Sequence, residues 1–167
     1  MSSSDKPLVI VLMGSESDWE TMQRTHKTLD EFGVPHVCRV LSAHRTPDGV
    51  AKFVRETDAN GAEVYIAGAG LAAALPGAVA ALTTRPVLGV PIQSGALNGH
   101  DALLAMAQMP PGVPVGALAI GAPGATNAAL LAVAVLANKY PEYAERLKTY
   151  RASQAEKIAA VKLPCEG

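Results

Sequence analysis

The stretch LVIVLMGSESDWE, residues 8–20, decides the fold of this chain. Its first six residues, Leu8–Met13, are all apolar, which is typical of a strand buried on both faces of a parallel sheet. The polar segment Gly14–Asp18 then ends the strand, and apolar residues recur near one helical face until Gly33. A buried strand, a glycine turn and a helix in this order predict an α/β fold.

Strand and helix patterns alternate along the rest of the chain. Further strands are predicted at 34–41, 62–67, 86–90 and 115–120, and further helices from 46–47, from the loop after 70 to about 82, and at 100–108, 127–138 and 141–161. This alternation requires crossover connections, so the sheet should be parallel with helices on both faces. We therefore predict one domain over residues 1–167, a flavodoxin-like three-layer sandwich with a five-stranded parallel sheet. Its core covers about 7–138, and an extra C-terminal helix covers about 141–161.

Local signals predict how two of the helices begin. Ser17, with Glu20 three residues later, has the pattern of a capping box. Thr46 before Pro47 predicts an N-cap residue followed by proline at the first helical position. The second helix should therefore start directly after the short polar loop 42–46.

The composition argues against several classes of protein. The 167 residues are 49% hydrophobic, 17% charged and 4% aromatic, with a net charge of −1 and no basic stripe, so we expect no nucleic-acid partner. The apolar excess favours a subunit interface. Two long uncharged segments, Val64–Leu82 and Val113–Ala137, are broken by glycine and proline, so we expect no membrane span.

Cysteine use and the first residues of the chain favour a cytoplasmic location. The two cysteines, Cys38 and Cys165, make no disulfide framework and are expected to be free thiols in a reducing compartment. Residues 1–7 lack the basic-then-apolar order of a signal peptide.

The predicted sheet places the functional site at the carboxyl ends of its strands, where ligands bind in such folds. The loops at that edge are 14–18, 42–46, 68–70, 93–98 and 121–127. In the first loop, Ser15 and Ser17 suit a phosphate, and Asp18 can accept hydrogen bonds from ribose hydroxyls. In the second loop, Arg45 carries a permanent positive charge and paired N–H donors that suit phosphate or carboxylate. His44 can move a proton near neutral pH. The alternative is a structural helix entry, with Arg45 paired to a surface acid.

Missing motifs narrow the chemistry further. The sequence has no P-loop, dinucleotide fingerprint, nucleophile elbow or cluster with metal-ligand spacing. Of the other histidines, His26 falls on a predicted helix, His36 opens a strand, and His100 is expected at a solvated helix start. The chemistry that is left is proton transfer on a small phosphorylated ligand, with no metal and no bound cofactor.

Several segments together resemble the N5-carboxyaminoimidazole ribonucleotide mutase family of de novo purine (IMP) biosynthesis. They include VLMGSESDWETM at 11–22, VLSAHRTPD at 40–48, IAGAG at 66–70, PVLGVPIQS at 86–94 and GATNAALLA at 124–132. The resemblance runs from about Pro7 to Tyr150, and the segments occur in the family's order at predicted strand ends. It implies a flavodoxin-like fold, a homo-octamer, and an isomerase that moves a carboxylate from N5 to C4 without metal, ATP or biotin.

The resemblance also implies roles for individual residues. His44 would be the catalytic acid and base, while Ser15, Asp18 and Arg45 would bind the ribonucleotide and its phosphate. The loop Gly68–Gly70 would line the pocket that holds CO2. The full set of substrate-binding residues that we predict is Ser15, Ser17, Asp18, Ser42, Arg45, Gly68, Ala69, Gly70 and Leu71.

The sequence departs from the family pattern in the third loop. The family usually has GAGGAAHLPG, and this chain has GAGLAAALPG at 68–77, so Leu71 replaces a glycine and Ala74 replaces a histidine. Ala122-Pro123 likewise replaces a Lys-Ala pair. Two alternatives therefore stay open: a carboxylase that uses CO2 directly on the same fold, and a catalytically silent ribonucleotide-binding paralogue.

Overall fold

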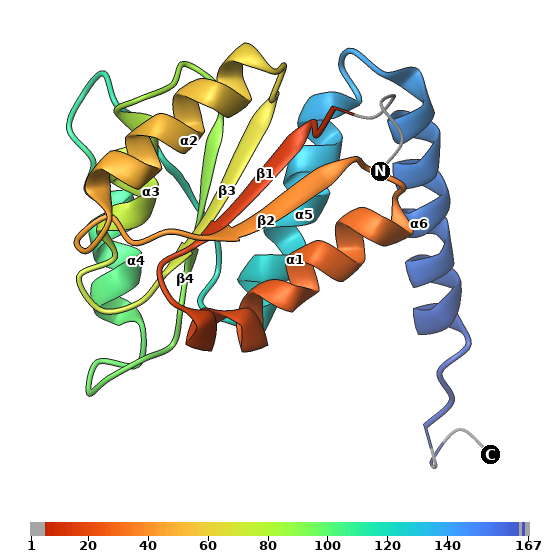
Figure 1. Cartoon of the computed structure of the whole chain (residues 1–167). Helices are drawn as coiled ribbons and strands as arrows, with labels where there is room; N and C mark the ends of the chain where they lie inside the picture. Colours follow the sequence, from red (N-terminus) through yellow and green to blue (C-terminus); the bar gives the residue numbers. More distant parts are fainter. Residues whose placement is uncertain (1–5, 164, 166–167) are drawn as a thin grey trace.

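A five-stranded parallel sheet with strand order β2-β1-β3-β4-β5 forms the centre of the chain (Figure 1). The structure is a computed structural model that describes residues 6–163 and 165. Its strands are β1 (Val9–Met13), β2 (His36–Val40), β3 (Val64–Ala69), β4 (Val87–Pro91) and β5 (Gly116–Ala117). Its helices are η1 (Glu16–Asp18), α1 (Trp19–Glu31), α2 (Pro47–Ala59), α3 (Ala74–Ala80), α4 (His100–Ala107), α5 (Ala122–Leu136) and α6 (Pro141–Ala159). This strand order is the flavodoxin-like one, so the predicted fold class is confirmed.

The first strand is buried on both faces, as its apolar run predicts. Alternate residues of a strand point to opposite faces, so Val9, Val11 and Met13 face one helical layer while Ile10 and Leu12 face the other. The first layer contains α1 and α5, and the second contains α2, α3 and α4 (Figure 1). These layers form two separate cores on the two faces of the sheet.

The C-terminal helix α6 packs against the α1–α5 layer. Tyr143 near its start is buried in that core, and the rings of Phe32 and Tyr150 lie 5.5 Å apart, centroid to centroid. Arg146 donates a hydrogen bond to the carbonyl oxygen of Phe32, just beyond the end of α1. The extra helix is therefore attached to the fold by side chains from its first half, Tyr143, Arg146 and Tyr150.

All five strands differ by at least one residue from their predicted bounds, and the third and fifth differ most. The third strand extends to Ala69 instead of Ala67, because Gly68 and Ala69 continue the pairing with β4. The fifth strand, predicted at 115–120, is regular only over Gly116–Ala117. Beyond it, isolated backbone bonds from Leu118 to Gly89 and from Gly121 to Pro91 replace a regular ladder.

The fifth helix begins five residues earlier than predicted. The expected start was 127, after a glycine-rich loop, but α5 starts at Ala122. Pro123 lies in the first turn, where the missing N–H of proline has no helical partner to lose. Gly121 precedes the helix with φ of +77°, a backbone region that favours glycine.

The predicted helix caps are partly wrong. The capping box uses Ser15 and Asp18 at the start of η1, not Ser17 and Glu20. Thr46 occupies the N-cap position before Pro47, but its side chain makes no capping bond to the helix. Its hydroxyl is used inside the preceding loop instead. Within residues 6–163 and 165, no helix is long and apolar enough to cross a membrane.

Candidate active site

A cavity of about 540 Å³ lies at the carboxyl ends of β1, β2 and β3. The loops that follow these three strands form its walls, and Ser94 from the loop after β4 completes them. Nine of the ten predicted site residues line it: Ser15, Ser17, Asp18, Ser42, His44, Arg45, Ala69, Gly70 and Leu71. The strand-end rule therefore located the cavity correctly, since these loops are far apart in the sequence.

In the loop after β1, the carboxylate of Asp18 accepts a hydrogen bond from the backbone of the same loop. Oδ2 of Asp18 accepts a hydrogen bond from the N–H of Ser15 at 3.0 Å, and only 9% of Asp18 is exposed. Burial raises the pKa of the Asp18 carboxyl, while the backbone N–H groups of Ser15 and Gly14 and the charge of Arg45 oppose that rise. Asp18 is thus a fixed acceptor at the wall of the cavity.

The loop after β2 is a closed turn held by Thr46. The hydroxyl of Thr46 donates to the carbonyl oxygen of Ser42 at 3.0 Å and accepts from the N–H of Ser42 at 3.0 Å. The N–H of Thr46 also donates to the same carbonyl oxygen at 2.8 Å. These bonds stiffen the turn that carries His44 and Arg45, and they explain why Thr46 does not cap α2.

The Arg45 side chain joins the two loops. Its Nη2 donates to the carbonyl oxygen of Gly14 at 3.0 Å, and its Nε donates to Oγ of Ser42 at 3.3 Å. In the part of the chain that the structure describes, Nη1 makes no hydrogen bond, so it is available to an anion in the cavity. The guanidinium is therefore positioned by protein groups and keeps donors for a ligand.

His44 differs from Arg45 in having no protein partner. Its ring is exposed and lines the cavity, and it makes no hydrogen bond to any described residue. Both ring nitrogens are free to exchange protons with a bound molecule. The two adjacent residues thus offer a fixed cation and a titratable group to the same space.

The loop after β3 carries backbone strain. Leu71 has φ of +54° and Ala73 has φ of +42°, both in the left-handed region that disfavours a side chain. A Cβ added to Gly95 would lie 2.8 Å from Cδ2 of Leu71, so the loops after β3 and β4 approach closely there. The residue that replaces a family glycine therefore still has the backbone conformation of a glycine.

Gly68, the tenth predicted site residue, does not line the cavity. It is a buried residue of β3, and a Cβ added to it would lie 2.5 Å from Sδ of Met22 on α1. Glycine is needed here because the helix packs directly on the sheet. Sequence reasoning placed it in the loop because the predicted strand ended two residues too early, at Ala67.

Not every loop predicted at this edge of the sheet contributes to the cavity. The segment 121–127 follows β5 at the far edge of the sheet and contributes nothing to the cavity. His100 does begin α4, where its Nδ1 lies 2.9 Å from the carbonyl oxygen of Leu97. Sequence reasoning missed Ser94 as a site residue, although its loop was correctly placed at the binding edge. Ala72 and Ala73, which were expected among the small residues of the pocket, do line it. The lining residues that were not expected are Gly14, Ala43, Ala74 and Leu75.

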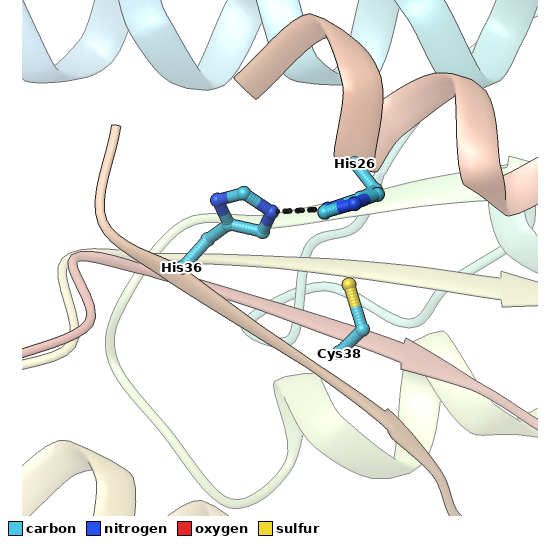
Figure 2. Close-up of side chains that lie close together, drawn as sticks. All are labelled: His26, His36 and Cys38. Carbon is cyan, nitrogen blue, oxygen red and sulfur yellow. Dashed lines mark hydrogen bonds between the residues drawn. The ribbon is translucent and has the colours of Figure 1, made fainter. Parts of the chain in front are cut away.

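The sequence has no cluster with metal-ligand spacing, but the fold brings three potential metal ligands together. His26, His36 and Cys38 lie together on the α1–α5 side of the sheet, with one potential ligand atom of each within 4.8 Å of the others (Figure 2). Their spacing in the sequence matches no metal motif because a helix and the next strand supply them separately. The cluster is outside the cavity.

Comparisons with known proteins agree with this arrangement. The sequence model of the AIR carboxylase family matches residues 8–157. N5-carboxyaminoimidazole ribonucleotide mutase of Pseudomonas aeruginosa is 54% identical over 151 residues, covering 90% of this chain and 93% of that protein. The mutase of Escherichia coli K12 is 51% identical over 159 residues, covering 95% and 94%.

Two further matches place the chain in context. It is 54% identical over 157 residues to the bifunctional purine synthesis protein purC/E of Dictyostelium discoideum, which covers 94% of this chain but only 16% of that longer protein. The crystal structure of Treponema denticola PurE has a TM-score of 0.84 and 32% identity, covering 92% of this chain and 94% of that one. On the family match and these relatives, the chain belongs to the AIR carboxylase family.

Proposed function

We propose that this chain catalyses the mutase reaction of de novo purine biosynthesis. In it, the carboxylate of N5-carboxyaminoimidazole ribonucleotide moves from N5 to C4 and gives 4-carboxy-5-aminoimidazole ribonucleotide, which makes the enzyme an isomerase. The observation that carries the proposal is that His44, Arg45 and Asp18 surround one cavity at the strand ends. Relatives that carry the mutase name share about half of their residues with this chain.

The cavity walls suggest how the ribonucleotide is held. Free donors on Arg45 and the hydroxyls of Ser15 and Ser17 suit the phosphate, while the Asp18 carboxylate accepts from the ribose. The small side chains of Ala69 and its neighbours, with the backbone of Gly70, leave room for a molecule of CO2 beside the base. Enclosure matters, since CO2 that escapes cannot complete the reaction.

His44 then moves the proton in both half-reactions. Protonated His44 donates to N5 as the bond between N5 and the carboxylate breaks, which releases CO2 and leaves aminoimidazole ribonucleotide. C4 attacks the retained CO2 and forms the new carbon–carbon bond. Neutral His44 removes the proton from C4, which restores aromaticity and returns the ring to its starting state. The reaction needs no external proton donor and no cofactor.

Direct use of CO2 is the alternative that the family description favours, since the matching family is named for a carboxylase. Arg45 argues for the mutase, because the branch that uses CO2 directly typically has lysine at this position. The two are separated by supplying aminoimidazole ribonucleotide with bicarbonate and no carbamate substrate. Saturation of the carboxylation rate at low CO2 would contradict the mutase proposal.

Substitution of His44 by asparagine tests the catalytic role. We expect turnover of N5-carboxyaminoimidazole ribonucleotide to fall by about 10²–10⁴-fold. Calorimetric binding of the product nucleotide should be retained, because Arg45 and Asp18 are unchanged. His100→Asn is the matched control, since His100 is exposed and outside the cavity. A wild-type chain that binds the nucleotide but shows no turnover would support the silent paralogue instead.

We also propose that the enzyme is a cytoplasmic homo-octamer that binds neither nucleic acid nor membrane. Large apolar side chains are exposed on different elements, among them Val40, Leu104 and Leu131. An apolar groove of about 300 Å³ also lies between α5 and α6, lined in part by Leu130 and Leu147. Such surfaces favour burial between subunits. Light scattering of the purified chain should give the octamer mass, and a stable monomer would contradict it.

A further inference from the structure

A second cluster of chemically active side chains lies at the other end of β2 from the active site. His36 and Cys38 are alternate residues of β2 and so face the same side, toward α1. His26 approaches them from α1 (Figure 2). Asp30 lies one helical turn after His26. His36 pairs with Val9 at the start of β1, whereas the active-site loop follows the end of β1. The cluster is therefore separate from the catalytic cavity.

The distances in the cluster are close to those around a tetrahedral metal ion. Nδ1 of His26 lies 2.8 Å from Nε2 of His36, and one ligand atom each from His26, His36 and Cys38 lie within 4.8 Å of one another. Zinc holds nitrogen at about 2.0–2.1 Å and thiolate sulfur at about 2.3 Å, which separates its ligand atoms by about 3.3–3.6 Å. The two ring nitrogens would therefore have to move apart by about 0.5 Å to share a zinc ion.

The His36 ring is already oriented for coordination. Its Nδ1 donates to the carbonyl oxygen of Val34 at 2.8 Å, because a carbonyl can only accept. In the neutral ring this fixes the proton on Nδ1 and leaves the Nε2 lone pair directed at the cluster. The His36 side chain is only 6% exposed, so the ring is held by its surroundings. A hydrogen bond from the second ring nitrogen to a carbonyl is the usual outer support of a metal-binding histidine.

Asp30 adds negative charge beside the cluster, although it is not among the three residues whose ligand atoms lie within 4.8 Å of one another. Its Oδ1 lies 3.8 Å from Nε2 of His36, and its Oδ2 lies 3.3 Å from Nε2 of His26. Two neutral imidazoles, one thiolate and one carboxylate carry a combined charge of −2. This charge balances a divalent ion, and the nitrogen and sulfur donors of the three clustered residues suit zinc.

A reactive thiol is the competing interpretation of Cys38, and its surroundings argue against it. Burial, and then the negative charge of Asp30, raise the pKa of the Cys38 thiol to about 11. Reactive cysteines need the opposite, a stabilised thiolate in an electropositive and accessible place. Without a metal, the hydrogen bond between His26 and His36 and the contact of His26 with Asp30 hold the cluster together.

We propose that His26, His36 and Cys38 bind a divalent zinc ion, with the negative charge of Asp30 beside it. The ion would fasten β2 to α1. Since β2 is an edge strand with a sheet neighbour on one side only, this link would hold it in place without touching the reacting nucleotide. The proposal is independent of the mutase reaction, because no residue of the cluster lines the catalytic cavity.

The test uses full-length, tag-free protein from which metals have been removed with a chelator. Titration with Zn²⁺ against a chromophoric chelator should give one bound zinc per chain. Co²⁺ should give a thiolate-to-cobalt absorption band and quench the fluorescence of Trp19, the single tryptophan, whose ring centroid lies 5.7 Å from that of His26. Failure to bind one equivalent of zinc would overturn the proposal and would leave His26 and His36 as a hydrogen-bonded pair without metal.

Matched variants separate this site from other thiols and histidines. Cys38→Ser should remove the cobalt–thiolate band, and both it and His26→Gln should weaken zinc binding by at least about 100-fold. Cys165→Ser and His100→Gln, at exposed positions elsewhere, should bind as the wild type does. His26 is 37% exposed, so its substitution keeps the test valid if Cys38→Ser fails to fold. Unchanged affinity in folded His26→Gln would sink the proposal.

Discussion

Replacing Leu71 by alanine and by glycine measures the strain in the loop that faces His44. A side chain in the left-handed region costs about 1–2 kcal/mol, and Leu71 has φ of +54°. Glycine removes that cost but has about 0.5–1 kcal/mol more backbone entropy to lose on folding. Alanine keeps the Cβ and its strain, while both variants lose the rest of a side chain that is already 54% exposed.

The difference in free energy of unfolding between the two variants therefore measures the effect of the backbone conformation at this position. We expect Leu71→Gly to be more stable than Leu71→Ala by about 0.5–1 kcal/mol, a factor of about 2–5 in the folding equilibrium. Urea unfolding at one fixed protomer concentration measures this, since subunit association shifts apparent stability. Comparison with wild type alone would mix this term with the lost contact to Gly95.

Ala72→Gly is the control at the next position. Ala72 is also exposed in the loop, but its φ is not positive, so glycine there should destabilise the chain by about 0.5–1 kcal/mol. The two glycine substitutions, each compared with alanine at the same position, should thus have opposite signs. If Leu71→Gly is no more stable than Leu71→Ala, the strain inferred from the backbone angle is wrong.

Three further changes test other parts of the site. Gly68→Ala should destabilise the chain by about 1–3 kcal/mol in thermal unfolding, because the new Cβ would lie 2.5 Å from Sδ of buried Met22, and an equal effect in a Met22→Ala background would contradict this cause. Because burial raises the Asp18 pKa above 3.8, its ionisation opposes folding, so wild-type stability relative to Asp18→Asn should fall as pH rises from about 3.8. Urea unfolding of both proteins from about pH 3.5 to about pH 6 should show this fall in relative stability. If the stability of the wild type relative to Asp18→Asn rises instead, burial does not dominate the pKa of Asp18. Arg45→Gln should raise KM for the nucleotide by about 10–100-fold, with a smaller change in kcat. An unchanged KM would show that Arg45 does not bind the phosphate.

The sequence predicted the fold and the cavity because both depend on strong periodic signals. The run Leu8–Met13 and the alternation after it were sufficient to infer a parallel sheet, and the strand-end rule then located His44 and Arg45 in a shared cavity. Small errors in strand ends were enough to misplace single residues. Gly68 was assigned to the loop because a glycine usually ends a strand, whereas here it makes room for Met22.

Features that depend on contacts between distant elements were not predictable in the same way. The early start of α5 depends on Gly121 and on hydrogen bonds to the end of β4, which no local pattern reveals. The meeting of His26 with His36 and Cys38 likewise depends on how α1 lies on β2. The spacing of residues along a chain identifies a metal site only where one local motif supplies the ligands.

The position of Arg45 has a consequence for the thermodynamics of binding. A free arginine side chain has about 2 kcal/mol of rotamer entropy, and a ligand that must order it loses part of its affinity in doing so. Bonds to Gly14 and Ser42 restrict the side chain before any nucleotide arrives, so most of this entropy is lost during folding. The anion then meets an ordered cation, so ordering of the side chain subtracts less from the affinity.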